Sequence, residues 1–297
     1  MGNPAVFAGE TRKTGKCVCD FVYFDEKTEN RKGILLAFCA LLLYNNAKLF
    51  QGGPFVGELI AIVSGKGGTG KTSLCAGIGQ ALAEQGKRVL CVDCDVGMRN
   101  LDIALGLSHL GALSFQEALE YGLEKAAQHP QFPELRFLTA PMNCTSVNID
   151  TAQFGALLQQ ARGCFDYVLL DAPAGIEGGF HLAACHADRI VVVTGSDPAS
   201  IRDAGRAGQI LHSMDKNDVR IIVNRINPKT VKAMRLTVDD IMDRTGLPLL
   251  GIVPEDPEVV LAAAFETPLL KYTKKGAASA CRRIAQRIQG RRIPVSL

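Results

Sequence analysis

The stretch Ser-Gly-Lys-Gly-Gly-Thr-Gly-Lys-Thr at residues 64–72 decides the fold of this chain. It follows the apolar run Leu59–Val63 and leads into Thr72–Gln85, where apolar residues recur at helical spacing. A G-x-x-x-x-G-K-T pattern between a strand and a helix is a phosphate-binding loop, because its glycines let successive backbone N–H groups point at an anion. The sequence therefore predicts a nucleoside triphosphate site with its phosphates on the helix N-terminus.

This loop supplies most of the predicted contacts to the nucleotide. We expect Lys71 to contact the β and γ phosphates and the hydroxyl of Thr72 to bind Mg²⁺. The predicted set comprises Gly65, Lys66, Gly67, Gly68, Thr69, Gly70, Lys71, Thr72 and Ser73.

Strand-like and helix-like segments alternate after the loop. With 297 residues and 47% hydrophobic content, the chain can form one large α/β domain or two smaller ones. Near-continuous apolar runs predict strands at residues 88–93, 135–139, 167–171, 189–194, 219–224 and 249–254. Helices are predicted at residues 114–128, 151–162, 198–214 and 256–265. This alternation predicts a doubly wound, mostly parallel α/β sheet flanked by helices, with the ligand at the carboxyl ends of the strands.

Residues 1–57 do not follow this pattern, so we predict an N-terminal extension before a domain at 58–297. Their apolar run, Ile34–Tyr44, would span roughly 16 Å as a helix, too short for a bilayer core of about 30 Å. Three interpretations remain open: a packing helix, an interaction segment that can be disordered, or translated sequence ahead of the true start.

The ten cysteines have no regular spacing, which favours reduced thiols over a disulfide framework. Cys91 and Cys94 form a C-x-x-C pattern on a predicted strand. Residues three apart on a strand point to opposite faces, so we expect neither a metal site nor a redox pair there.

Three aspartates follow predicted strands and complete the expected site. Asp171 ends an apolar run in a Walker B arrangement and is predicted to reach Mg²⁺ through its water shell. Asp93 and Asp95 end the second strand; we predict Asp93 as a further metal residue and Asp95 as the residue that orients the attacking water. Because three carboxylates would repel a polyphosphate, a cation is implied. The alternative is that these acids only cap loops.

A second lysine in the loop, Lys66, narrows the choice of family. Residues 66–72 resemble the deviant Walker A motif of the MinD/ParA ATPases. Residues 93–102 and 171–177 resemble the switch I and switch II segments of this family, and 193–203 resembles a later strand-to-helix turn. Gly-x-Arg-Asn-Leu-Asp, starting at Gly97, is similar to the MinD branch, whereas ParA-type partition proteins usually have a Gln-Gly pattern there.

The resemblance implies roles for further residues. Lys66 would cross to the nucleotide of a partner subunit, so that ATP holds a homodimer together. Asn224 and Arg225 lie in a segment that resembles the turn binding the adenine base, and the segment Pro254, Glu255, Asp256 resembles the loop that closes over it. The resemblance covers residues 59 to about 295.

The C-terminus departs from the family pattern. Residues 280–290 resemble the last core helix, and the chain stops where an amphipathic membrane-targeting helix normally begins. After Glu266 there are eight Lys/Arg and no acid, and removing these eight from the net charge of +3 leaves −5 for the rest. This basic tail indicates an anionic partner or a solvated helix. Cys281, Ile284, Ala285 and Ile288 share one face and offer a small apolar stripe to an anionic membrane.

Taken together, the resemblance implies an ATPase switch, with ATP and Mg²⁺ as cofactors, that helps place the bacterial division septum. Its expected partners are a second copy, a division inhibitor and an activator, in the cytoplasm, with peripheral membrane attachment left open. One alternative is a DNA-partition ATPase, less favoured because a basic tail does not by itself make a DNA-binding face. Others are a flagellar-number regulator, a phosphate-loop ligase and an iron–sulfur carrier. A carrier would need a C-terminal Cys-x-x-Cys, and only Cys281 is there.

Overall fold

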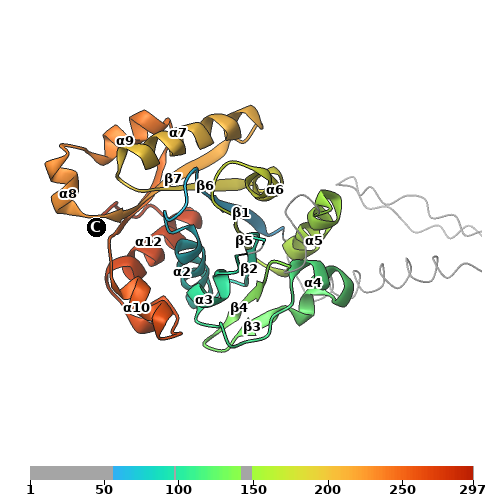
Figure 1. Ribbon diagram of the computed structural model, residues 1–297. Coiled ribbons are helices and arrows are strands. Elements are labelled where there is room, and N and C mark those ends of the chain that lie inside the picture. Colours follow the sequence, from blue (N-terminus) through green and yellow to red (C-terminus); the bar gives the residue numbers. More distant parts are fainter. Residues whose placement is uncertain (1–55, 97, 142–148, 297) are drawn as a thin grey trace, which may run out of the picture. The chain divides into compact units, whose positions relative to one another are not determined.

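The computed structural model describes residues 56–96, 98–141 and 149–296, which belong to one unit, Phe55–Leu297. Its centre is an eight-stranded sheet in the order β3-β4-β2-β5-β1-β6-β7-β8 (Figure 1). All neighbouring strands are parallel except β3 and β4. The strands are β1 (Glu58–Val63), β2 (Val89–Asp93), β3 (Ala127–His129), β4 (Phe132–Leu138), β5 (Tyr167–Asp171), β6 (Arg189–Thr194), β7 (Asp218–Ile226) and β8 (Leu249–Pro254).

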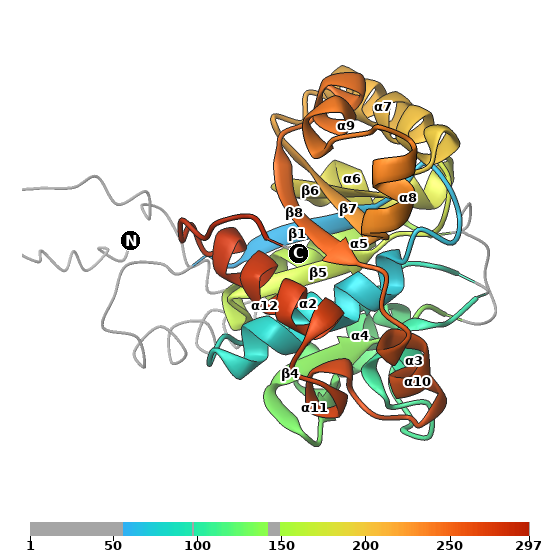
Figure 2. The same ribbon diagram turned by 90° about the vertical axis from the view of Figure 1, so that its left-hand side faces the viewer.

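Helices cover both faces of this sheet. One face carries α2 (Lys71–Glu84), α3 (Leu101–Leu105), α10 (Glu258–Ala264), α11 (Leu269–Tyr272) and α12 (Gly276–Ile288). The other carries α4 (Phe115–Tyr121), α5 (Thr151–Cys164), α6 (Gly178–His186), α7 (Pro198–Ser213) and α9 (Val238–Thr245), with α8 (Pro228–Ala233) near the edge. In Figure 2, α12 lies alongside α2 across the sheet. The predicted doubly wound α/β fold is confirmed.

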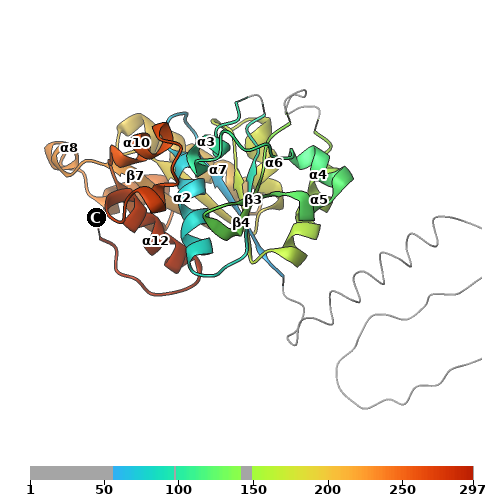
Figure 3. The same cartoon turned by 90° about the horizontal axis from the view of Figure 1, so that it is seen from below.

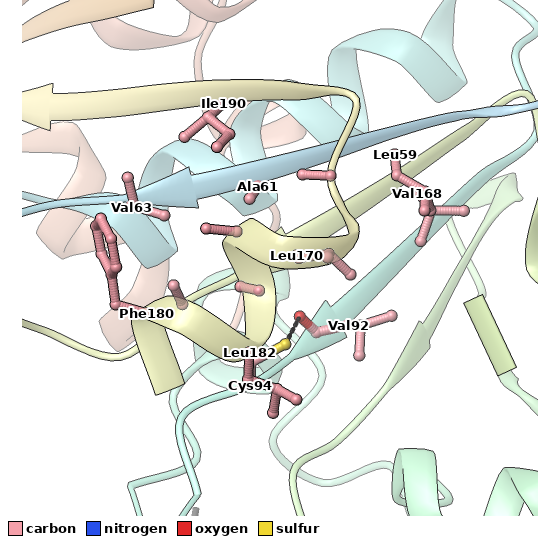
Figure 4. Packing of buried hydrophobic residues seen from close by; sticks show 14 of the residues in the cluster. Leu59, Ala61, Val63, Val92, Cys94, Val168, Leu170, Phe180, Leu182 and Ile190 are labelled. Atoms are coloured by element: carbon pink, nitrogen blue, oxygen red, sulfur yellow. Dashed lines mark hydrogen bonds between the residues drawn. The ribbon is translucent and has the colours of Figure 1, made fainter. Parts of the chain in front are cut away.

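The strand β1 shows why the sheet is buried on both sides. Leu59, Ala61 and Val63 point into the core beneath α5, α6 and α7, and Figure 4 shows them with Val168 and Leu170 of β5. The intervening residues of β1 belong to the core beneath α2 and α12. Every residue of this strand after Glu58 is fully buried, as the continuous apolar run predicts.

The predicted helix at 114–128 is wrong in its second half. A capping box of Ser114 and Glu117 starts α4 as the sequence suggests. Gly122, with φ at 90°, ends it seven residues later, because a left-handed residue cannot continue a helix. A short 3-10 turn, Leu123–Lys125, and the strand β3 follow, and β3 pairs antiparallel with β4.

The apolar stripe of the C-terminal helix is part of the core. Cys281, Ile284, Ala285 and Ile288 are at most 4% exposed, packed against α2 and β8. This confirms the last core helix that the resemblance implies. It also means that the stripe is not available to a membrane in this fold. The expectation that this helix offers an apolar stripe to a membrane is therefore wrong.

Several basic residues of the tail also hold the fold together. Arg282 donates from Nε and Nη2 to the Glu84 carboxylate of α2, at 2.6 and 3.1 Å. Arg287 donates to the backbone carbonyls of Leu250 in β8 (3.1 Å), Ile293 (3.0 Å) and Pro294 (2.6 Å). Much of the basic charge read from the sequence is therefore structural.

Two further expectations concern thiols and membranes. Cys91 belongs to the core beneath α2, and Cys94 to the core on the opposite face, so the C-x-x-C residues point apart as predicted. Within the described residues, no helix is long and apolar enough to cross a membrane. The apolar run of the predicted extension, and all of that extension except Val56 and Gly57, lie outside the described residues.

Candidate nucleotide-binding site

The phosphate loop connects β1 to α2 at the carboxyl edge of the sheet. Gly68 and Gly70 have φ values of 77° and 89°, which a residue with a Cβ adopts only with strain. A Cβ at Gly70 would also lie 2.4 Å from Nδ2 of Asn224. Gly70 therefore lets the loop turn directly into α2, whose first-turn residues line the cavity described below.

Lys71 is the first residue of α2 and is only 7% exposed. Its Nζ donates to the Oγ of Ser64 at 3.0 Å, and this hydroxyl donates to the carbonyl of Lys66 at 2.6 Å. Burial lowers the pKa of Lys71, while Asp171 and Asp95 act in the opposite direction. A buried ammonium attracts an anion strongly, because water screens its charge poorly.

Lys66 has the opposite environment. Its side chain is 46% exposed, and its Nζ lies 3.5 Å from Oδ1 of Asp197. Asp197 caps α7 by accepting from the N–H of Ser200 at 3.0 Å. The lysine that the sequence assigns to a partner's nucleotide is thus held at the surface by an exposed ion pair within its own chain.

Asp171 is almost fully buried at the end of β5. Burial raises its pKa to about 8, a hydrogen bond with the Thr72 side chain lowers it, and the nearby Asp93 raises it. Its Oδ1 atom has no hydrogen-bond partner among the described residues. A buried oxygen without a partner, next to a threonine hydroxyl, fits a hydrated Mg²⁺, because hard oxygen ligands and ordered water suit this cation.

Asp93 uses its carboxylate to shape the loop after β2. It accepts from the N–H groups of Asp95 at 2.9 Å and of Asn100 and Leu101 at 3.3 Å. Burial raises its pKa to about 6, and these three N–H groups act in the opposite direction. Both of its oxygens therefore already have backbone partners, as in the loop-capping alternative, and its metal role stays a prediction.

Asp95 lies just beyond β2 and is less buried than Asp93. Burial raises its pKa, and the charge of Lys71 lowers it. A carboxylate that is partly exposed and close to Lys71 is suitably placed to orient a water molecule. This role stays a prediction.

A cavity of about 770 Å³ opens beside the loop and unites three predicted segments. Of the predicted residues, its walls include Gly68, Gly70, Lys71, Thr72, Ser73, Asn224, Arg225, Pro254, Glu255 and Asp256. Apolar residues of α10, α11 and α12 form the far wall, among them Val259, Leu269 and Cys281. An apolar chamber beside a phosphate loop is suited to a nucleoside.

The carboxyl end of β7 is bonded to the phosphate loop itself. Asn224 donates from Nδ2 to the carbonyl of Thr69 at 2.8 Å, and Arg225 donates to the carbonyl of Gly68 at 3.3 Å. The amide nitrogen of Asn224 thus donates to the loop, and its side-chain oxygen can accept a hydrogen bond from a ligand. The predicted contacts of both residues with the base remain predictions.

In the segment 254–256, the two acidic side chains accept hydrogen bonds from neighbouring elements. Asp256 accepts from the N–H of Glu258, at the start of α10 (3.0 Å), and from that of Ala277, in the first turn of α12 (2.8 Å). Glu255 accepts from Nδ2 of Asn227 at 3.3 Å. The carboxylate of Asp256 therefore positions one wall of the cavity, whereas the sequence assigned it to the base.

The structure does not bring every predicted residue to the cavity wall. Gly65, Lys66, Gly67, Thr69, Asp93, Asp95 and Asp171 lie outside that lining. Gly65 is explained by packing, since a Cβ there would lie 2.4 Å from the carbonyl oxygen of Asp203 in α7. A Cβ at Gly67 would lie 3.6 Å from the Cβ of Ala174, in the segment that resembles switch II.

Sequence reasoning missed two residues of the site. Ser64 could have been noticed as a polar residue at the end of an apolar strand. Asp197 precedes Pro198 and carries the signature of a helix start. Its pairing with Lys66 joins positions 131 apart, so no local signal could have revealed it.

The fold and this loop place the chain in a class of nucleotide-binding proteins. It belongs to the family described as the CobQ/CobB/MinD/ParA nucleotide binding domain, which it matches over residues 60–269. Within that family, its relatives include several proteins named septum site-determining protein MinD. The MinD of Synechocystis sp. is 36% identical over 242 residues, covering 80% of this chain and 91% of that protein. The MinD of Bacillus subtilis is 36% identical over 248 residues, covering 82% and 92%.

Solved structures agree with this assignment. The MinC:MinD cell division protein complex of Aquifex aeolicus contains a chain 37% identical to this one, with a TM-score of 0.74 over 81% of this chain and 99% of that one. The septum site-determining protein MinD of Pyrococcus horikoshii, complexed with Mg-ADP, is 27% identical with a TM-score of 0.68, covering 78% and 96%.

Proposed function

We propose that this protein is an ATP-dependent dimerising switch, hydrolysing ATP to ADP and phosphate, that helps place the bacterial division septum. The observation that carries the proposal is the loop at 64–72, whose buried Lys71 and exposed Lys66 occur in a chain that is about 36% identical to MinD proteins over most of its length. We further propose a cytoplasmic location, because the switch requires ATP.

The phosphate side of the mechanism rests on buried groups. Lys71 and the N–H groups at the start of α2 bind the phosphate oxygens. Mg²⁺, held by Thr72 and near Asp171, would neutralise the charge that develops during hydrolysis. Asp95 orients the attacking water, and Asp93 accepts hydrogen bonds from the backbone N–H groups of Asp95 and Leu101.

The switch side rests on Lys66. Because its ion pair with Asp197 is about half-exposed, that pair contributes only ~0–1 kcal/mol, little enough for the phosphates of a second subunit to replace it. Loss of the γ phosphate would remove that alternative partner, and the dimer would dissociate. The dimer surface would recruit a division inhibitor, as the MinC:MinD complex of Aquifex aeolicus suggests, and an activator.

The substitution Lys66→Ala tests this proposal. We expect it to abolish the ATP-dependent dimer in light-scattering chromatography, because the contact across the interface is lost. The affinity for ADP should stay within about threefold of the original, since an exposed lysine contributes little to the site in its own chain.

The matched control is Lys274→Ala, which removes an exposed lysine far along the chain from the loop. That variant should dimerise with ATP as the unaltered protein does. A Lys66→Ala protein that still elutes as a dimer with ATP would remove the basis of the proposal.

A further inference from the structure

A second hollow lies beneath the short helix α8, on the opposite side of the β7 end from the nucleotide cavity. Its volume is about 300 Å³, and it lies between α8, α9 and the ends of β7 and β8. Its lining is apolar except for one lysine: Ile226, Pro228, Val231, Lys232, Leu236, Val238, Ile241 and Ile252. Val231, Leu236 and Val238 are only partly buried, so apolar surface is open to solvent here.

Three basic residues lie on and just after α8. Lys229 and Lys232 are about one helical turn apart in α8, and Lys232 lines the hollow; Arg235 follows the end of the helix. All three are exposed, and no hydrogen bond or ion pair joins their side chains to the described residues. Figure 3 shows α8 projecting from the body of the molecule at its edge.

The same strand end contributes to both cavities. Asn224 and Arg225 line the nucleotide cavity, and Ile226 and Pro228 line the hollow. The N–H of Glu255, a residue of the nucleotide cavity, donates to the carbonyl of Ile226 at 3.0 Å. Whatever occupies the hollow therefore contacts the segment that holds the phosphate loop, a position suited to a regulatory protein.

We propose that the hollow between α8 and α9 is a docking site for an acidic amphipathic segment of a partner protein. Apolar side chains of that segment fill the hollow, and flanking carboxylates pair with Lys229, Lys232 and Arg235. The volume is at the small end of ligand pockets and takes a few side chains. A peptide is favoured over a nucleic acid because the centre of the surface is apolar, and nucleic-acid interfaces are strongly polar.

A designed peptide tests this directly. The probe is a fluorescein-labelled helical peptide with two leucines four positions apart, flanked by glutamates, titrated into the full-length protein at low salt. We expect a rise in anisotropy, with methyl NMR shifts at Val231, Leu236, Val238, Ile241 and Ile252. Two further peptides, one with serine for leucine and one with glutamine for glutamate, should each bind at least about tenfold more weakly.

A protein variant then locates the contact. Lys229→Glu, Lys232→Glu and Arg235→Glu together should weaken binding by about tenfold or more, because charge pairs at the rim become repulsive. A control with Lys274→Glu, Arg291→Glu and Arg292→Glu has the same change in net charge on another exposed segment and should bind as before. Unchanged thermal unfolding shows that both variants are folded.

Three results would overturn the proposal: no methyl shifts in the hollow, equal binding of the three peptides, or equal weakening by the two variants. Binding of duplex DNA or of phosphatidylglycerol vesicles through Lys229, Lys232 and Arg235, without peptide binding, would also overturn it. Because the assay needs neither hydrolysis nor dimerisation, its result is independent of the function proposed above.

Discussion

The carboxyl edge of the sheet and the terminal helix α12 hold their charged groups in opposite ways. At the edge, Asp171 is buried with an oxygen that has no partner among the described residues, and Lys71 is buried beside it. In α12, Arg282 and Arg287 are charged too, but their guanidinium groups donate to Glu84 and to backbone carbonyls. At the edge, Asp171 has an oxygen that can still bind a ligand, whereas the arginines of α12 already form hydrogen bonds that stabilise the fold.

This contrast teaches how to separate functional charge from structural charge. A charge with satisfied hydrogen bonds lowers the energy of the free protein, and a buried one without them raises it. Substitution of Asp171 should therefore cost activity and preserve or improve stability. Substitutions in α12 should do the reverse.

The largest expected effect is that of Asp171→Asn. Without the carboxylate that we propose lies near Mg²⁺, hydrolysis of ATP should fall by about 10²-fold or more, measured as phosphate release with Mg²⁺. In the absence of nucleotide and Mg²⁺, the same variant should be more stable than the unaltered protein at pH 8, by roughly 1–3 kcal/mol in urea unfolding, because a buried charge has been removed.

The pH dependence follows from the raised pKa of Asp171, about 8 in the folded protein against 3.8 ordinarily. Between these values the folded state binds the proton more tightly than the unfolded state does. The free energy of unfolding of the unaltered protein should therefore decrease as the pH rises from about 4 to 8. Asp171→Asn should flatten this decrease, and an equally steep curve for the variant would show that another group is responsible.

In α12 we expect the effect to be on stability. Ile284 is fully buried against Gly251 of β8, where a glycine leaves space for it. Ile284→Ala should lower the free energy of unfolding by about 2–4 kcal/mol, because it leaves a cavity. Val295→Ala, at a position 50% exposed, is the control and should change it by less than about 0.5 kcal/mol. Similar losses in both variants would mean that α12 is not packed as described.

The smallest effect should come from Arg282→Ala, which removes the pair with Glu84 and a hydrogen bond to the carbonyl of Leu270. The pair is partly exposed, so we expect a loss of about 0.5–1 kcal/mol. The hydrogen bond from Arg282 holds the pKa of Glu84 below its ordinary value. The contribution of the pair is therefore present above pH about 4.5 and is lost as the pH falls further. Urea unfolding at pH 7 and pH 3 measures this, with Arg291→Ala as the control; a loss that is undiminished at pH 3 would exclude the ion pair as its source.

Prediction from the sequence was most accurate where one local pattern has one structural solution. The glycine loop, its flanking strand and helix, and the aspartate that ends β5 follow from spacing alone. The strand β3 was missed because Ala126 and Ala127 favour a helix locally, and only pairing with β4 makes them extended. The burial of Ile284 and Ile288 was also not predictable from an amphipathic pattern, which is the same whether protein or lipid covers it.

For the site, the sequence predicted which residues take part and left their contacts with one another undetermined. Asp256 was assigned to the base, yet its carboxylate accepts from the N–H of Ala277 in a helix twenty residues later. The pair of Lys66 and Asp197 likewise depends on how α7 packs beside the loop. Such contacts arise from the tertiary structure and cannot be read from spacing.

The contact of Arg287 with Leu250 has a consequence for biosynthesis. The strand β8 is the outermost strand of the sheet on its side, and its outer carbonyls could pair with a strand of another chain. Arg287 occupies one of them and is itself held by the carbonyls of Ile293 and Pro294. During translation, β8 is complete about forty residues before Pro294 is added and these hydrogen bonds of Arg287 can all form. We therefore expect the nascent protein to be most prone to aggregate in that interval.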